Sequence, residues 1–267
     1  MKIENIKETV KQKYSSIARQ SVLSVNNNCC EPSGCCGQLE FSMIGDEYFH
    51  VEGYNADADL GLGCGLPTEF AGIQKGHVVL DLGCGAGNDC FVARSLAGDT
   101  GKVIGLDFSE EMLEKANLNI QKTGYNNIEF ILGDIENIPL SGSIFDVVIS
   151  NCVLNLVPEK QKAFAEIYRV LKPGGHFCIS DVVLYGSLPV ELKEAAELYV
   201  GCVSGAILKD DYVNIIKQPG FKNIEIKKEK PVNIPDSVLT KYLDVMGINT
   251  FRQSNKGIYS ITITGVK

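Results

Sequence analysis

Short apolar runs alternate with amphipathic stretches between residues 77 and 183. Five of these runs are typical of buried strands: HVVLDLG, KVIGLD, NIEFILGD, FDVVISN and HFCISDVV. The residues between them fit helices, because Asn88 and Ser109 can cap two of these helices and Gly124 suits the end of the second. A third helix, PEKQKAFAEIYRVL, is stopped by the KPGG that follows it. This alternation predicts a parallel sheet with helices on both faces.

The segments on either side of this region follow other patterns. Residues 5 to 20 place apolar side chains at helical spacing, whereas residues 26 to 38 and 55 to 66 have the composition of loops. After residue 183 we predict helices over 189–200, 209–217 and 236–246, and alternating strands at FKNIEIKKEK and YSITITGVK. We expect these last two strands to form an antiparallel pair at the edge of the sheet.

Composition and charge indicate a globular protein with a small substrate. Of the 267 residues, 45% are hydrophobic and 22% are charged, which is enough for one large core or two modest ones. No apolar run approaches the roughly 18 residues that span a bilayer, and MKIENIKETVKQKYSS contains no apolar signal stretch. A net charge of −8 argues against a nucleic-acid partner, which requires clustered Lys and Arg. We expect a cytoplasmic protein without a membrane or nucleic-acid partner, with a monomer as the default.

The chain contains ten cysteines, which is unusual for a reducing compartment. Four of them form two adjacent pairs in the loop NNNCCEPSGCCGQ. A disulfide framework would require export, which nothing in the first residues supports. Four interpretations are open on these grounds: a metal site, a redox device, a substrate site for a soft ion, and buried unreactive thiols.

A glycine-rich turn, DLGCGAG, follows the first predicted strand. Its GxGxG spacing, with Asp81 two positions ahead of the first glycine, differs from the GxGxxG of dinucleotide-binding proteins. Asp107 ends the second strand, where a carboxylate can accept both hydroxyls of a ribose, and Asp134 ends the third. The ordered motifs DLGCGAGND, GLDFSEEM, GDIENIPL, FDVVISN and RVLKPGGH resemble those of the class I S-adenosylmethionine methyltransferases.

This resemblance implies S-adenosylmethionine as the cofactor and suggests which residues bind each part of it. Asp81, Gly83, Gly85 and Gly87 would face the methionine portion, and Asp107 would hold the ribose. The other expected cofactor residues are Phe108 and Met112 beside the adenine, Asp134 and Ile135 at its amino edge, and Asn151 near the sulfonium. Periodicity alone also allows Met112 to be a core residue of a helix, and Asp134 to be a turn or cap residue.

Three separate cysteine segments resemble the arsenite methyltransferases: LGCG at Cys64, SNCVLNLVP at Cys152 and GCVSGA at Cys202. A single cysteine at a strand end is more often a packing residue, but three matching segments favour chemistry. The resemblance implies that these three thiolates bind arsenic(III), whose lone pair attacks the sulfonium methyl group. Soft thiolates suit a soft centre. The substrate would then be arsenite or one of its thiol conjugates.

The same resemblance implies a further cysteine for delivery or redox resolution. Cys35 has the best spacing to Cys64, with Cys36 next, although the family has a single cysteine where this chain has pairs. By family analogy, thioredoxin or glutathione would reduce oxidised thiols. We assign the remaining cysteines of the cofactor turn and fifth strand to packing: Cys84, Cys90 and Cys178.

We therefore predict an α/β fold with a Rossmann-like class I methyltransferase sheet, mostly parallel with an antiparallel last strand. Residues 1–70 would form a helix and a cysteine-rich arsenic-binding cap, 71–185 the cofactor domain, and 186–267 a C-terminal region completing the sheet and the acceptor site. Two alternatives make the cysteines incidental or structural. One is a methyltransferase of an organic metabolite, which would need a general base, and the other is a thiolate module that binds zinc or a metalloid.

Overall fold

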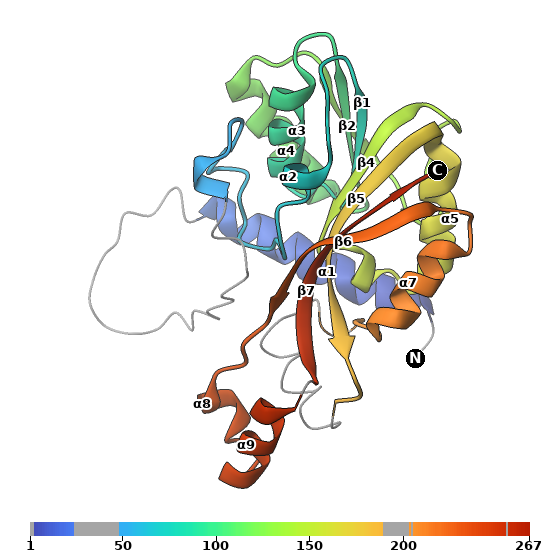
Figure 1. The fold of residues 1–267 in the computed structure, drawn as a ribbon. Helices are drawn as coiled ribbons and strands as arrows, with labels where there is room; N and C mark the ends of the chain where they lie inside the picture. Colours follow the sequence, from blue (N-terminus) through green and yellow to red (C-terminus); the bar gives the residue numbers. More distant parts are fainter. Residues whose placement is uncertain (1–2, 24–47, 189–202, 204, 255) are drawn as a thin grey trace.

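The computed structural model describes residues 3–23, 48–188, 203, 205–254 and 256–267, and its centre is a seven-stranded sheet (Figure 1). The strands follow the order β3-β2-β1-β4-β5-β7-β6. Their bounds are β1 Val78–Leu82, β2 Lys102–Asp107, β3 Ile128–Leu132, β4 Phe145–Asn151, β5 Leu171–Tyr185, β6 Lys222–Pro231 and β7 Gly257–Val266. Strand β7 pairs antiparallel with β5 and β6, and the other pairs are parallel. The predicted fold class is confirmed.

Helices cover both faces of this sheet, with α2, α3 and α4 on one side and α5 and α7 on the other (Figure 1). Their bounds, with the two short 3-10 helices, are α1 Ile3–Leu23, η1 Tyr48–His50, α2 Pro67–Phe70, α3 Asn88–Ala97, α4 Glu110–Thr123, η2 Leu154–Leu156, α5 Lys160–Val170, α7 Lys209–Lys217, α8 Asp236–Leu239 and α9 Val245–Gln253. No helix in the described ranges is long and apolar enough to cross a bilayer.

Each face of the sheet has its own apolar core. Phe164 of α5, Phe177 of β5 and Tyr212 of α7 pack together on one face. The Phe164 ring centroid lies 6.1 Å from that of Phe177 and 5.7 Å from that of Tyr212. On the opposite face, Phe91 of α3 packs with the partly buried Phe130. Apolar side chains on both faces of the central strands explain their continuous hydrophobic runs.

The local signals at helix ends are partly confirmed. The Ser109 side chain caps α4 by accepting from the Met112 backbone nitrogen at 3.3 Å, and Gly124 ends that helix in the left-handed region. The predicted cap at Asn88 is wrong, because Gly87 precedes α3 with a φ of 95° and Asn88 is the first helical residue. The turn reaches α3 through a conformation that favours glycine, so Asn88 is not at the cap position.

The segments outside the central region also differ in part from the predictions. Helices α1 and α7 are present where they were expected, whereas the predicted helix over 189–200 lies outside the described residues. The single helix predicted over 236–246 is wrong, because two short helices, α8 and α9, occupy this region. Asp244 separates them by capping α9, accepting from the Gly247 backbone nitrogen at 2.7 Å. Strand β5 starts at Leu171, so the KPGG that stops α5 lies within a strand.

Candidate active site

A cavity lies at the carboxyl ends of β1, β2 and β4, where the chain turns from strand to helix. It encloses about 790 Å³, including the part that opens to solvent. Most of the predicted cofactor residues line it: Asp81, Gly83, Gly85, Asp107, Phe108, Met112 and Asn151. Parallel α/β sheets bind ligands at this edge, so the cavity is the candidate active site.

The glycine-rich turn forms one wall of the cavity with its backbone. Gly83 and Gly85 have φ values of 68° and 51°, in the region that favours glycine. A Cβ atom on Gly83 would overlap the Val153 side chain, whereas one on Gly85 would meet only the Met112 sulfur, at 4.0 Å. Gly87 does not line the cavity. A Cβ atom on Gly87 would instead meet the Phe130 ring at 2.8 Å. The turn therefore exposes backbone at Gly85, and Gly87 serves packing and chain direction.

Asp107 is a buried carboxylate with a backbone N–H donor on each side. Its Oδ2 accepts from the Gly85 backbone nitrogen and its Oδ1 from that of Ser109, each at 2.9 Å. Burial raises the pKa of Asp107 above its ordinary value, and the two N–H donors oppose that rise by stabilising the charged form. The carboxylate is held in one orientation at the cavity wall and has lone pairs left for a ligand's hydroxyl groups.

A second cavity of about 490 Å³ adjoins the first and shares Gly83, Asp107 and Phe108 with it. Asp134 and Ile135 line this cavity, together with Lys7 and Val10 of α1. The Lys7 ammonium lies 2.6 Å from Asp134 Oδ2 and also pairs with Glu136. Helix α1 therefore covers this part of the site, a contact that sequence analysis missed because its residues are more than 120 positions apart.

Two buried carboxylates, Asp81 and Asp89, line the first cavity. Desolvation, reinforced by the neighbouring charge of Asp89, raises the pKa of Asp81 well above its ordinary value, and its Oδ2 accepts from the Cys90 thiol at 3.2 Å. Burial raises the pKa of Asp89 to about 6, against the hydrogen bonds from Tyr48 and Asn151 that favour its charged form. Tyr48 and Asp89 were not singled out in the sequence, although Asp89 is the last residue of the motif DLGCGAGND.

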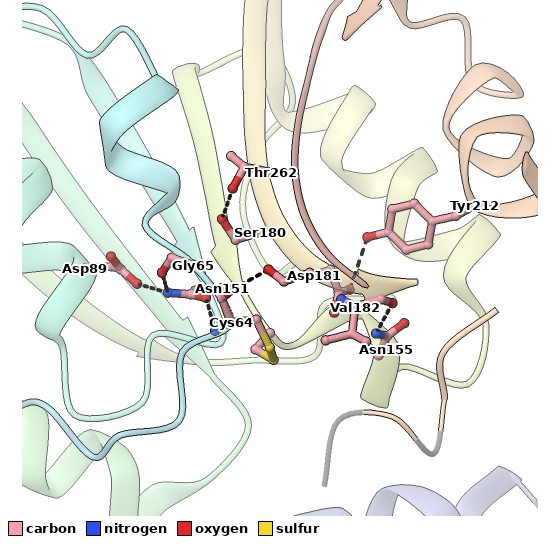
Figure 2. The surroundings of a disulfide bond; sticks show 12 residues. Cys64, Gly65, Asp89, Asn151, Asn155, Ser180, Asp181, Val182, Tyr212 and Thr262 are labelled. Carbon is pink, nitrogen blue, oxygen red and sulfur yellow. Dashed lines mark hydrogen bonds between the residues drawn. A yellow bond between two sulfur atoms is a disulfide. The ribbon is translucent and has the colours of Figure 1, made fainter. Parts of the chain in front are cut away.

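Cys64 and Cys152 are joined as a disulfide beside the cavity, with their Cα atoms 5.3 Å apart (Figure 2). Cys152 lines the cavity directly after β4 and has a φ of 60°. Cys64 lies in the loop before α2 and is buried. The structure thus brings together two cysteines separated by 88 positions in the sequence. Both sulfurs are within reach of one soft ion once the disulfide is reduced.

The other predicted cysteines are divided between described and undescribed residues. Cys202, Cys35 and Cys36 lie outside the described residues. Cys84, Cys90 and Cys178 are buried free thiols, and burial raises the pKa of Cys84 to about 11. Cys84 also lines the cavity, whereas Cys178 lies within β5. Within the described ranges, no group of three or more His, Cys, Asp or Glu residues could hold a metal ion.

Comparisons with known proteins place the chain among methyltransferases. Residues 73–229 match the family model described as "Methyltransferase domain". An arsenite methyltransferase of Halobacterium salinarum is 41% identical over 84% of this chain, and one of Aquipseudomonas alcaligenes is 33% identical over 88%. The chain spans 59% of the first relative's length and 68% of the second's.

Solved structures agree with this result. The crystal structure of an arsenic(III) S-adenosylmethionine methyltransferase from Chlamydomonas reinhardtii has a TM-score of 0.65 and 36% identity. The alignment covers 77% of this chain and 67% of that protein. The similarity therefore extends over most of this chain.

Proposed function

Because the chain belongs to the arsenite methyltransferase family of S-adenosylmethionine-dependent enzymes, we propose that it transfers methyl groups from S-adenosylmethionine to trivalent arsenic held by its cysteine thiolates. The observation that carries this proposal is the pairing of Cys64 with Cys152 at the cavity. Two thiolates that meet beside a cofactor cavity suit a soft substrate ion. Methylated arsenicals would be the products.

The described residues fit the cofactor. The Gly85 backbone faces open space and the Asp107 carboxylate is oriented at the wall, as a ribose and a charged amino acid require. We propose that Asp81, Gly83 and Gly85 hold the methionine portion, Asp107 the ribose, and Phe108, Met112, Asp134 and Ile135 the adenine. When bound, S-adenosylmethionine supplies a methyl group activated by its sulfonium charge.

Cys64 and Cys152 would hold the arsenic with its lone pair available to the methyl group. Backbone hydrogen bonds hold both cysteines in place, so little conformational entropy is lost when the substrate binds. We propose Cys202 as the third thiolate, since Val203 packs in the same apolar cluster as Cys64 and Cys152. A cysteine of the loop at Cys35 or Cys36 would deliver the arsenic.

The disulfide makes a reductant part of the proposal. Neither sulfur can bind arsenic while the S–S bond is intact. Breaking that bond takes two electrons and two protons, which one dithiol of thioredoxin or two molecules of glutathione can supply while being oxidised to their own disulfides. We propose such a thiol reductant as the partner, and the cytoplasm, where these reductants occur, as the location.

Incubation with arsenite, S-adenosylmethionine and glutathione tests the proposal. We expect chromatography with elemental detection to show methylated arsenic. Replacement of Cys64, Cys152 or Cys202 by Ser should abolish this product and leave S-adenosylmethionine affinity unchanged. Cys178→Ala is the matched control, because Cys178 is buried in β5 and does not line the cavity.

Confirmed cofactor binding without any methylated arsenic would show that the acceptor is not arsenite. The chain would then act on an organic acceptor, and full turnover by the cysteine variants would agree with that outcome.

A further inference from the structure

The Asn151 side chain brackets the peptide groups around Cys64. Asn151 is the last residue of β4 and immediately precedes Cys152. Its Oδ1 accepts from the Cys64 backbone nitrogen and its Nδ2 donates to the Gly65 carbonyl oxygen, each at 2.9 Å (Figure 2). One carboxamide therefore connects the backbone on both sides of Cys64 to the neighbour of Cys152.

Glycines on both sides of Cys64 allow this close approach. A Cβ atom on Gly63 would lie 3.0 Å from Asn151 Nδ2, and one on Gly65 would lie 2.8 Å from the Ser180 hydroxyl oxygen. The Gly-Cys-Gly segment can thus lie against the strand ends, where bulkier residues would push the loop away. The two glycines have a packing reason that is independent of any ligand.

Asp89 and Tyr48 fix the orientation of the Asn151 carboxamide. Its Nδ2 lies 2.7 Å from the Tyr48 hydroxyl oxygen and 3.1 Å from Asp89 Oδ2. The Tyr48 hydroxyl donates to the other carboxylate oxygen of Asp89 at 2.7 Å. Since these acceptors lie on the amino side, the carboxamide oxygen must face the Cys64 N–H.

We propose that Asn151 is a positioning residue that holds Cys64 beside Cys152, with Asp89 and Tyr48 keeping its carboxamide in the required orientation. Cys152 is held independently of Asn151, because its backbone nitrogen donates to the Ser180 backbone carbonyl oxygen at 2.8 Å. Both thiols of the pair are thereby fixed before anything binds to them. This role is additional to the sequence-based expectation of Asn151 near the sulfonium, since Asn151 also lines the cavity. Its consequence for arsenic rests on the proposed function, but the thiol geometry does not.

The equilibrium of the Cys64–Cys152 disulfide with glutathione measures how well the two thiols are held together. The full-length protein is equilibrated in buffers of defined glutathione redox ratio, alkylated and digested, and the two peptides are quantified by mass spectrometry. We expect Asn151→Ala to lower the effective concentration of one thiol for the other by about 10- to 100-fold, the usual cost of losing a residue that orients ligands. No arsenic is present, so this result is independent of the proposed function.

Asn127→Ala is the matched control. The Asn127 carboxamide is also partly buried and donates to two backbone oxygens, those of Gly98 and Gly101, but does not contact the Cys64 loop. This variant should retain the wild-type equilibrium. An equal shift in both variants would assign the effect to general loosening and overturn the proposal.

Tyr48→Phe and Asp89→Asn keep the proposal testable if Asn151→Ala does not fold. Each leaves both Asn151 contacts with the Cys64 loop in place and removes one orienting partner, so each should shift the disulfide equilibrium less than loss of Asn151. A wild-type disulfide equilibrium in both variants would overturn the proposal that Tyr48 and Asp89 orient the Asn151 carboxamide. In turnover assays with arsenite, Asn151→Ala, Tyr48→Phe and Asp89→Asn should each raise KM for arsenite.

Discussion

A Cβ atom on residue 205 would overlap the backbone oxygen of Asn155, so Gly205 and Asn155 make a contact that only glycine permits. Asn155 is itself held in place. It is buried in η2, and its side-chain amide donates to the Val182 oxygen of β5 at 2.6 Å. The contact joins the segment that follows Cys152 to the segment that follows Cys202 in the sequence.

Gly205→Ala should therefore displace that second segment. We expect a loss of about 1–3 kcal/mol in the free energy of unfolding, the usual cost of overpacking, together with reduced arsenic methylation. Gly124→Ala is the control, because a Cβ atom there meets no atom within 4 Å and adds only the strain of a positive φ. Urea unfolding and methylation assays should separate the two variants. Unchanged methylation in a destabilised Gly205→Ala protein would mean that this contact does not affect the acceptor site.

Asp107→Asn should weaken cofactor binding. Both Asp107 oxygens accept from backbone N–H groups, and an amide replaces one acceptor by a donor that faces an N–H. An unsatisfied buried donor costs about 1–3 kcal/mol, so we expect affinity for S-adenosylhomocysteine to fall by about 10- to 100-fold in titration calorimetry. The control is Asp99→Asn, whose side chain is 88% exposed. Equal affinity in the two variants would remove Asp107 from the binding site.

Lys7→Ala should make α1 a looser cover over the second cavity. Lys7 pairs with Asp134 at 2.6 Å, and farther along α1 Ser15 donates to Glu111 at the same distance. Partly exposed ion pairs contribute up to about 1 kcal/mol, so stability should change little while labelled S-adenosylmethionine dissociates about 5-fold faster. High salt should reduce the difference from wild type, because it screens the pair. The control is Lys11→Ala on the same helix, which should release labelled S-adenosylmethionine at the wild-type rate. A salt-independent difference would exclude the ion pair as the cause.

The parts of the fold that sequence analysis predicted correctly depend on residues that are close together in the sequence. Apolar strands, the Ser109 cap and the final glycine of α4 each follow from a few adjacent positions, and parallel strand ends bring Asp81 and Asp107 to one edge. The cap at Asn88 was wrong because the preceding turn takes the chain into α3 through the left-handed conformation of Gly87. A polar residue such as Asn88 gives no sign that the glycine before it will take the cap position in the left-handed conformation.

The contacts that complete the site are long-range, and local patterns do not encode them. Cys64 was associated with Cys152 only through the family resemblance, since nothing in their spacing specifies a pair. Lys7 reaches Asp134 from a helix at the start of the chain. Asn151 lines the cofactor cavity, and its carboxamide also contacts the Cys64 loop, which only the folded geometry could show.

Asp181 is a fully buried carboxylate on β5 whose burial raises its pKa from 3.8 to about 7. The Val182 backbone nitrogen and the Tyr212 hydroxyl donate to it, at 2.9 and 3.1 Å, and the charge of Lys160 also favours its ionised form, but burial outweighs them. Because the folded state holds this proton more tightly than the unfolded state, the proton's contribution to stability is fully present below about pH 4. It is lost as pH rises through 7.

Asp181→Asn removes this titration and should flatten the pH dependence of stability. Between pH 5 and 8 we expect the free energy of unfolding to fall by about 2–3 kcal/mol more in the wild type than in the variant. Asp81 and Asp89 titrate in both proteins, so the difference in slope isolates Asp181. Urea unfolding at several pH values measures it, with the exposed Asp99→Asn as a control that should follow the wild type. Parallel curves for wild type and Asp181→Asn would mean that Asp181 does not hold its proton at neutral pH.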